Sequence, residues 1–227
     1  MASFCKLVTV VLLSVFLLVT PQAPKPCCTP HVFTTGLATL TLAPQQSGQP
    51  DALISQEGDY YFDGPNKRVA INVTVQVLDS QQPSQQIYQI NDFNKKMMYI
   101  IVDNTTCQKS PLSGDFPNND CIPDNATFLG TVKLGESYAV NRWLIDAPPI
   151  RQDVTMTVDQ CIPVTSVLTA QEAGITMTSQ EYYNFKTSID NPDEKFTPPS
   201  ICNTASLFTR SISRIHRSTI KSPFMAL

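Results

Sequence analysis

Hydrophobic and polar residues alternate most regularly between Val69 and Val77. Valine or isoleucine occupies every odd position of this stretch, while small or polar residues, Asn72 among them, occupy the even positions. A period of two places the two sets on opposite faces of a β-strand, one buried and one facing water. The sequence therefore predicts a strand here, with Asn72 on its solvent face.

Similar runs, separated by turn residues, continue through most of the chain. Asp63-Gly64-Pro65-Asn66 separates an aromatic run from Val69, which predicts a hairpin. A second hairpin is expected from Gln86–Phe93 and Lys96–Asp103, with its turn at Asn94 and Lys95. Further strands are expected at Thr127–Leu134, Ser137–Ile145, Val154–Val158, Ile162–Thr169 and Ile175–Thr178.

Many short strands at this spacing predict an all-β chain with a curved antiparallel sheet or a sandwich. The 18 prolines, spread along most of the 227 residues, argue against long helices. Helical structure is expected to be minor, with one short turn within residues 171–184.

The N-terminus has the pattern of a secretory signal peptide. The apolar run Leu7–Val19 follows a short segment that contains Lys6, and a polar exit ends near Ala23. A membrane-spanning helix is less favoured, because it needs roughly 20 apolar residues. We therefore expect a signal peptide over residues 1–23, a secreted β domain over residues 24–202 and a tail over residues 203–227.

The cysteines fit this extracellular assignment. Of the seven, Cys5 lies in the expected signal peptide, and the remaining even number is typical of disulfides in a secreted chain. Spacing alone does not choose among their possible pairings. These cysteines are Cys27, Cys28, Cys107, Cys121, Cys161 and Cys202.

Three Asn-x-Ser/Thr sequons begin at Asn72, Asn104 and Asn125. Behind a signal peptide, such tripeptides are typical of N-linked glycans on the protein surface. The sequence therefore predicts a glycoprotein.

The formal net charge of −3 is unevenly distributed. The body up to Cys202 is acidic, which argues against a nucleic-acid partner because it would repel phosphates. The tail carries only basic charges, at Arg210, Arg214, Arg217 and Lys221. A disordered tail is favoured, with a basic amphipathic helix as the alternative.

The motifs of the common enzyme classes are absent from the sequence. It contains no G-x-S-x-G, no H-E-x-x-H, no P-loop and no G-x-G-x-x-G, and it has only two histidines. We therefore expect no enzymatic activity and no cofactor. Oxygen-bearing side chains do cluster at Asp115, Asn118, Asn119, Asp120 and Asp124, where a plain polar loop is favoured over a weak Ca²⁺ site.

Several motifs, in order from residue 27 to residue 202, together resemble the ependymin-related proteins. The most specific is Phe196-Thr-Pro-Pro-Ser-Ile-Cys202 near the end of the body. The others are Cys27-Cys28-Thr-Pro30, Tyr61-Phe-Asp-Gly-Pro-Asn-Lys-Arg-Val69, Cys107 followed by Ile122-Pro-Asp-Asn-Ala-Thr-Phe128, and Trp143 followed by Cys161-Ile-Pro-Val164.

This resemblance implies two stacked, strongly curved antiparallel sheets that enclose an apolar pocket, similar to bacterial lipoprotein-carrier folds. It implies a secreted or lysosomal glycoprotein, commonly a homodimer, that binds a fatty acid or another lipid. Calcium-dependent adhesion of cells to the extracellular matrix is the alternative function. The resemblance also implies that Cys107 pairs with Cys202, that Cys27 or Cys28 pairs with Cys161, and that Cys121 takes the remaining cysteine.

Residues on the inward faces of the expected strands are candidates for the lining of the implied pocket. At each position, an ordinary place in the hydrophobic core is the alternative interpretation. The candidates are Val73, Val75, Ile90, Tyr99, Ile101, Trp143, Val154 and Met156.

Overall fold

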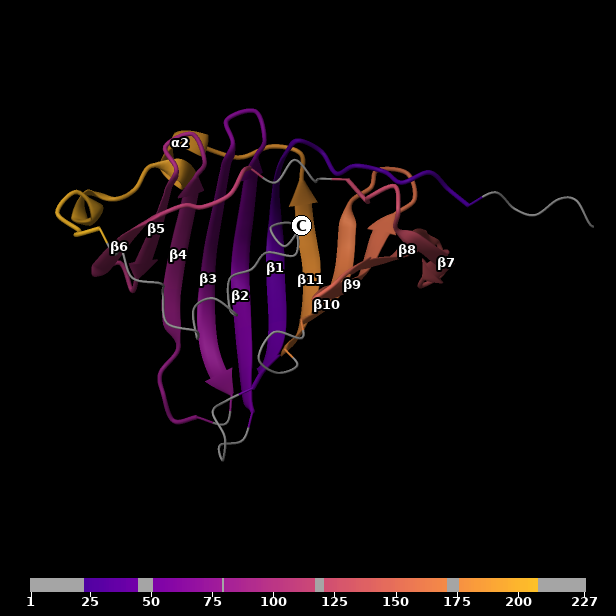
Figure 1. The fold of residues 1–227 in the computed structure, drawn as a ribbon, viewed down its shortest axis with the longest axis horizontal. Helices are drawn as coiled ribbons and strands as arrows, with labels where there is room; N and C mark the ends of the chain where they lie inside the picture. The colour runs from indigo at the N-terminus through magenta and orange to yellow at the C-terminus, as the bar shows by residue number, and fades with distance from the viewer. Residues whose placement is uncertain (1–22, 45–50, 79, 117–120, 171–175, 208–227) are drawn as a thin grey trace, which may run out of the picture.

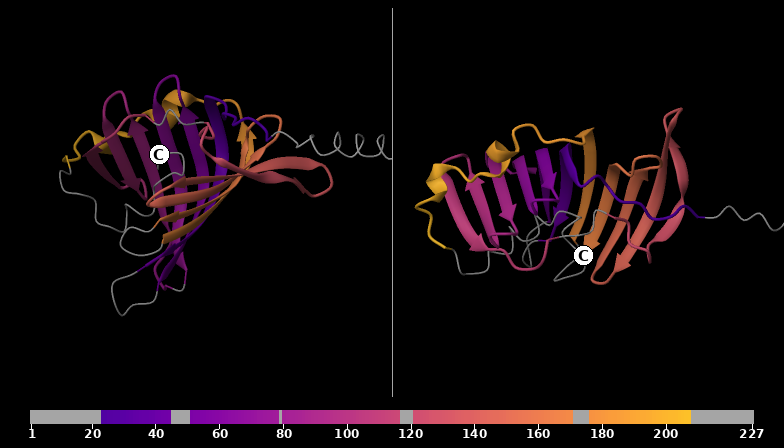
Figure 2. Two further views of the ribbon diagram at one scale, coloured as in Figure 1. Left: turned by 45° about the vertical axis from the view of Figure 1, so that its right-hand side comes forward. Right: turned by 90° about the horizontal axis from the view of Figure 1, so that it is seen from above.

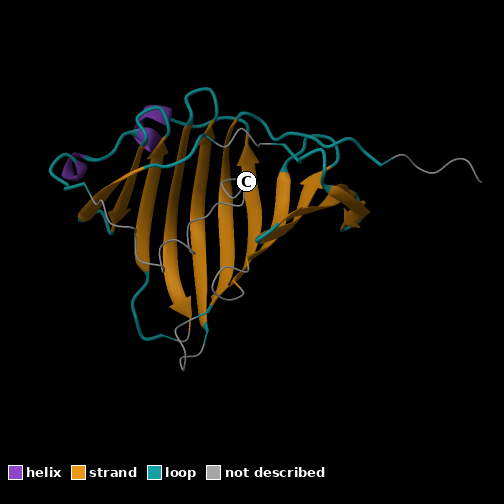
Figure 3. Ribbon diagram, viewed as in Figure 1, coloured by secondary structure: helices purple, strands orange, loops and turns teal. Residues whose placement is uncertain are grey.

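A computed structural model describes residues 23–44, 51–78, 80–116, 121–170 and 176–207. Residues 1–22 of the expected signal peptide and residues 208–227 of the expected tail lie outside this part. The described chain is almost entirely β structure (Figures 1 and 3). Its strands are β1 (Val32–Ala43), β2 (Ala52–Asp63), β3 (Arg68–Leu78), β4 (Gln85–Asp92), β5 (Met97–Val102), β6 (Thr106–Pro111), β7 (Thr127–Leu134), β8 (Tyr138–Ala147), β9 (Ile150–Thr157), β10 (Pro163–Ala170) and β11 (Thr176–Lys186).

All eleven strands form one antiparallel sheet, in the order β6-β5-β4-β3-β2-β1-β11-β10-β9-β8-β7. Two meanders, β1–β6 and β7–β11, meet where β1 pairs with β11. Figure 2 shows that the sheet is strongly twisted, so that β7–β10 cross the direction of β1–β5. The expected all-β antiparallel architecture is confirmed.

The two stacked, strongly curved sheets that the resemblance implies correspond to the two meanders, which are continuous with each other because β1 has partners on both sides. It pairs with β2 from Val32 opposite Asp63 to Ala43 opposite Ala52, and it also pairs with β11. No free strand edge therefore remains between the two meanders, and they form one continuous twisted sheet.

The seam between β1 and β11 contains a change of register between Thr34 and Gly36. A Cβ atom at Gly36 would lie 2.1 Å from Cε2 of Tyr183 on the neighbouring strand. Only glycine therefore allows this tyrosine ring to lie across the seam. The hydroxyl of Thr35 also donates a hydrogen bond to the carbonyl of Tyr183, at 3.0 Å.

β11 occupies part of the segment for which a short helical turn was expected. Threonine, tyrosine and phenylalanine are frequent between Thr176 and Lys186, and these residues favour strands. Helical structure is limited to α2 (Pro192–Phe196) and the single 3₁₀ turn η1 (Ser200–Cys202) in the part of the chain described. No helix in that part is long and apolar enough to cross a membrane.

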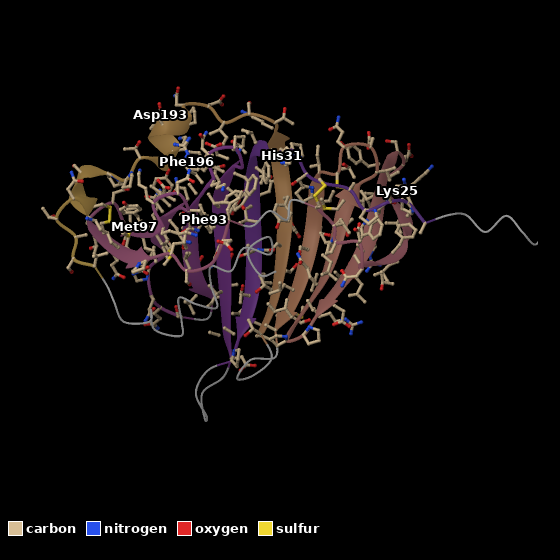
Figure 4. All side chains as sticks on the ribbon, turned by 45° about the horizontal axis from the view of Figure 1, so that its top comes forward. Lys25, His31, Phe93, Met97, Asp193 and Phe196 are labelled. Atoms are coloured by element: carbon tan, nitrogen blue, oxygen red, sulfur yellow. A yellow bond between two sulfur atoms is a disulfide. The ribbon has the colours of Figure 1, made fainter. Side chains whose placement is uncertain are left out.

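The adjacent residues Tyr61 and Phe62 define the two faces of the sheet. The Tyr61 face of β2–β6 is covered by the segment that contains α2 and η1, with α2 against β3 and η1 against β6. Figure 4 marks Asp193 and Phe196 on this covering segment. The Phe62 face is the opposite side of the same strands and continues through the seam to β8.

Candidate functional site

The eight candidate pocket residues lie in three clusters rather than one. Val73 and Val75 belong to the cluster around Phe33 and Phe62, on the Phe62 face. Trp143, Val154 and Met156 form a second cluster at the far end of the sheet, together with Ile122, Ile145 and Cys161. Ile90, Tyr99 and Ile101 pack on the Tyr61 face against Phe196 and Cys202.

The expectation that Ile90, Tyr99 and Ile101 face inward together with Val73 is therefore wrong. Alternation along β4 turns Gln89 and Asn91 to the Phe62 face and Ile90 to the Tyr61 face. Both faces of this strand are buried, one of them beneath a segment about a hundred residues further along the chain. Hydrophobicity alone could not distinguish the two faces.

The register connects the first two clusters along one row of cross-strand partners on the Phe62 face. The ends of this row are apolar, and its middle consists of polar side chains that are at most 7% exposed. From β3 to β8 the partners are Val75, Gln56, Thr39, Gln180, Ser166, Val154 and Trp143. We call the four polar members, Gln56, Thr39, Gln180 and Ser166, the polar row.

Part of the polar row is held by hydrogen bonds within the sheet. Gln152 donates to the Ser166 hydroxyl at 3.0 Å, and the Tyr182 hydroxyl donates to Oε1 of Gln180 at 3.3 Å. Among the described residues, the Thr39 hydroxyl is buried without a hydrogen-bond partner, as are Oε1 of Gln89 and Nε1 of Trp143 on the same face. Buried polar atoms nearly always have partners, so these three need an explanation.

On the Tyr61 face, two sequence motifs that are far apart in the chain come into contact. The guanidinium carbon of Arg68, in the β2–β3 hairpin, lies 4.5 Å from the centre of the Phe196 ring. The same Arg68 donates to the carboxylate of Asp63 at 2.6 Å, and Asn66 donates to that carboxylate from its side chain and its backbone. These contacts lock α2 onto the hairpin.

Three disulfides complete the framework. Cys107 pairs with Cys202, Cys27 with Cys161, and Cys28 with Cys121. The first holds the end of the covering segment to β6, and the other two hold the N-terminal segment beside the Trp143 cluster. The structure has the pairings that the resemblance implies, and in it Cys27, rather than Cys28, joins Cys161.

A small polar recess lies at the edge of α2 on the Tyr61 face, with a volume of about 220 Å³. The strands and the turn before β6 contribute Tyr61, Asn72, Gln86, Tyr88 and Asn104. The helix contributes Glu194 and Lys195.

Two tyrosines of this recess have raised pKa values. Burial, together with the carboxylates of Asp59 and Glu194, raises the pKa of Tyr61 to about 12. Burial also raises the pKa of Tyr88, whose hydroxyl donates to the backbone carbonyl of Lys195. Both phenols are therefore neutral at physiological pH, and the Tyr61 hydroxyl likewise donates a hydrogen bond, to the Asp59 carboxylate at 3.3 Å.

The expected calcium loop is only partly within the described structure. Asp115 and Asp124 are both exposed, while Asn118, Asn119 and Asp120 lie outside the described residues. Across the described ranges, no three His, Cys, Asp or Glu side chains gather as a metal site. A Ca²⁺ requirement therefore stays a prediction of the sequence.

A family model of the ependymins matches residues 81–202, which is more than half of the chain. The chain belongs to the ependymin family. The matched region runs from just before β4 to η1 and includes Cys107, Cys121, Cys161 and Cys202. No curated protein sequence matches the chain.

Solved structures resemble the ependymin-family chain only distantly. An uncharacterised conserved protein from Thermus thermophilus is 10% identical, with a TM-score of 0.46, over 80% of this chain and 91% of the other. A LolA superfamily protein from Nitrosomonas europaea is 11% identical, with a TM-score of 0.27, over 74% and 91%. A β-barrel-like protein from Brucella abortus is 8% identical, with a TM-score of 0.34, over 72% and 100%. At TM-scores below 0.5, function has to be judged from this chain's own residues.

Asp63 gives the ependymin-family chain a specific acid sensitivity. Burial raises the pKa of this carboxyl, but the hydrogen bonds from Arg68 and Asn66 outweigh burial and hold the pKa below its ordinary value of 3.8. The carboxylate therefore contributes stability above this value, and the contribution is lost as the pH falls through the folded-state pKa. We expect Asp63→Asn to lower the free energy of unfolding by about 2 kcal/mol at neutral pH.

The measurement is urea unfolding of wild type and Asp63→Asn from neutral pH down to about pH 2. The difference between the two proteins should shrink on acidification. Asp190→Asn is a matched control, because Asp190 is exposed and only 3.8 Å from Lys186 in a surface pair. A difference between wild type and Asp63→Asn that is independent of pH would contradict the assignment.

Proposed function

We propose that this member of the ependymin family is a secreted glycoprotein that binds a fatty acid or another lipid against the Phe62 face of its sheet. One observation carries the proposal: three buried polar atoms that have no partner in the described part of the chain lie on this face, alongside two apolar clusters. A bound ligand with both polar and apolar parts would supply the missing hydrogen bonds.

The apolar clusters give such a ligand its affinity. The Phe33 cluster adjoins half-buried side chains on the same face, including Val75, Val102 and Leu112. At the other end, Phe128 packs on Trp143, with 5.1 Å between the ring centres. A hydrocarbon chain along this face would gain roughly 25 cal/mol for each Å² of apolar surface removed from water.

The polar row gives the ligand its orientation. Pockets that hold mainly apolar ligands commonly use a few fixed polar groups to position the head of the molecule. Gln56, Thr39, Gln180 and Ser166 provide amide and hydroxyl groups but no charge. They would suit a carboxyl, ester or hydroxyl head group that hydrogen-bonds without needing a counter-ion.

The disulfides and the sequons support secretion. Three disulfides in a chain of this size are typical of an oxidising compartment. Asn104 and Asn125 are exposed and Asn72 is half-buried, so all three sequon asparagines reach the surface of the folded protein.

Native mass spectrometry of the secreted protein, with lipid extraction from the same sample, tests the proposal directly. We expect a co-purifying lipid at a defined ratio to protein, and the same spectrum gives the number of chains in the complex. Protein that carries no lipid and takes up no added long-chain fatty acid would overturn the proposal.

Thr39→Val tests the site itself. This substitution removes a buried hydroxyl without a partner, so the ligand-free protein should be as stable as wild type or more stable. If the hydroxyl pairs with the ligand, affinity for a long-chain fatty acid should fall roughly five- to tenfold, the equivalent of one hydrogen bond. Displacement of a fluorescent fatty acid measures the change.

Thr41→Val is the matched control on the same strand and face. Its hydroxyl already shares a 3.1 Å hydrogen bond with Thr178. This variant should lose about 1 kcal/mol of stability and keep its fatty-acid affinity. Equal affinities for wild type and Thr39→Val would show that the ligand does not reach the polar row.

A further inference from the structure

The polar recess beside α2 brings two of the three sequons together. The side-chain oxygen of Asn72 accepts a hydrogen bond from Gln86 at 3.3 Å. The side-chain nitrogen of Asn104 donates to the other end of the same glutamine, at 3.2 Å. A chain of three amides, all of which line the recess, therefore links the two asparagines.

The two asparagines differ in what they leave free. Asn104 lies in the turn between β5 and β6, is exposed, and already uses its amide nitrogen in the hydrogen bond to Gln86. Asn72 uses only its oxygen, and its amide nitrogen donates no hydrogen bond within the described part of the chain. The nitrogen that a glycan requires is thus unengaged at Asn72.

Position in the sheet restricts Asn72 much more than Asn104. Asn72 lies in the middle of β3, between Asp59 on β2 and Tyr88 on β4. Its neighbour on the same face, Ala70, is fully buried, and α2 packs against this strand. Thr74, the next residue on this face in the other direction, is exposed, so a group attached to Asn72 is confined on the side of α2, where the recess lies. A group on exposed Asn104 leaves directly into solvent.

The walls of the recess suit a neutral sugar. Glu194 and Lys195 contribute one charge of each sign, so the recess has no net preference for an anion or a cation. Amide, hydroxyl, carboxylate and ammonium groups offer both donors and acceptors to sugar hydroxyls. The Tyr61 and Tyr88 rings add aromatic surface, with the Lys195 ammonium 5.5 Å from the centre of the Tyr61 ring.

The size of the recess fits one ring rather than a lipid. Its volume of about 220 Å³ is below the roughly 300–1,000 Å³ of pockets that hold larger organic ligands. It is therefore distinct in size, polarity and location from the lipid-binding face proposed above.

We propose that this recess seats the first sugar of an N-linked glycan on Asn72, enclosed by Tyr88, Glu194 and Lys195. The donor would be a lipid-linked diphospho-oligosaccharide. The Asn72 amide nitrogen bonds to C1 of its first sugar, the bond from C1 to the diphosphate oxygen breaks, and the nitrogen loses one proton. The proposal rests on the secretion and glycosylation included in the proposed function, and it assigns the glycan a fixed place on the fold.

Glycopeptide mass spectrometry of protein secreted by animal cells, followed over time during digestion with peptide-N-glycosidase F, provides the test. We expect Asn72 to be occupied and its glycan to be released from native protein at least tenfold more slowly than the glycan on exposed Asn125. After reduction and denaturation, the two rates should become similar, because the recess no longer exists.

Two neighbouring acidic residues of α2 provide matched variants. Glu194→Ala removes a wall of the recess and should accelerate release from Asn72 several-fold. Asp193→Ala removes another exposed carboxylate of the same helix that does not line the recess, and it should leave the rate unchanged. Neither variant alters a buried side chain, so both should fold.

The possible failures are distinguishable. The proposed position of the glycan would be overturned if Asn104 or Asn125 carries a glycan while Asn72 does not, or if the glycan is released from native Asn72 as fast as from Asn125. Either result would leave the assignment as a secreted glycoprotein intact. Equal rates for wild type and Glu194→Ala would likewise overturn the proposed position. Absence of glycan at all three sequons would overturn both this inference and the glycoprotein assignment.

Discussion

Replacing Cys107 and Cys202 by alanine is expected to lower the free energy of unfolding by about 4–5 kcal/mol. The disulfide joins residues that are 95 positions apart, and the chain-entropy model gives this value for a loop of that length. Such a loss is a large fraction of the roughly 5–15 kcal/mol that stabilises an ordinary domain. Denaturant unfolding under non-reducing conditions measures it.

The Cys28–Cys121 disulfide offers a matched comparison, because it spans 93 residues. Its double alanine variant should lose a similar amount of stability by the same entropic argument. Only the Cys107/Cys202 variant, however, releases the segment that covers the Tyr61 face. Hydrogen exchange should therefore accelerate in α2 and η1 for that variant alone, and equal protection in both variants would contradict this role.

Replacing Phe196 by alanine is expected to cost about 3–5 kcal/mol, the usual range for a buried phenylalanine. The ring is 3% exposed and packs with Tyr61, Ile90 and Ile101. Its loss also removes the ring on which Arg68 stacks. Because this contact joins the β2–β3 hairpin to α2, the substitution should loosen the covering segment as well as leave a cavity.

Phe196→Leu separates packing from the interaction with Arg68. Leucine keeps most of the apolar volume, so this variant should lose only about 1–2 kcal/mol, including the contribution of the cation–π contact. Thermal and urea unfolding of the two variants beside wild type make the comparison. A loss below 1 kcal/mol for Phe196→Ala would show that α2 is not held in this way.

The sequence predicted those parts of the fold that depend on neighbouring residues. The alternation from Val69 to Val77 lies within β3, and the turn at Asn94 and Lys95 lies between β4 and β5, which pair as expected. In these elements, period-two patterns and turn residues act locally. The sequence can therefore specify them without information about distant strands.

Long-range pairings were beyond this kind of prediction. The strand β1 was not expected, because its threonine, glycine and alanine residues give a weak hydrophobic pattern. Its pairing with β11, which makes one sheet out of two meanders, depends on residues that are far apart in sequence. No local pattern records such a contact.

The candidate site was predicted in part. Val73 and Trp143 do lie on the same face of the sheet, but the polar row between them comes from strands whose pairing was unknown. Glu194 and Lys195 were not connected with Asn72, because α2 reaches β3 only in the folded protein. The register did hold one usable signal, since pairing β3 with β4 sets Asn72 opposite Tyr88.

The seam between β1 and β11 determines the order in which the molecule can be assembled. Every other ladder joins strands that are consecutive in the chain, so each can form as a hairpin soon after its residues are synthesised. Thr35 cannot form its hydrogen bond to Tyr183 until that residue, 148 positions later, has been synthesised. Until the chain has grown past β11, the inner edge of β1 has no partner, and an unpaired edge is where β proteins aggregate. The continuity of the finished sheet thus implies a period during biosynthesis when its centre is unprotected.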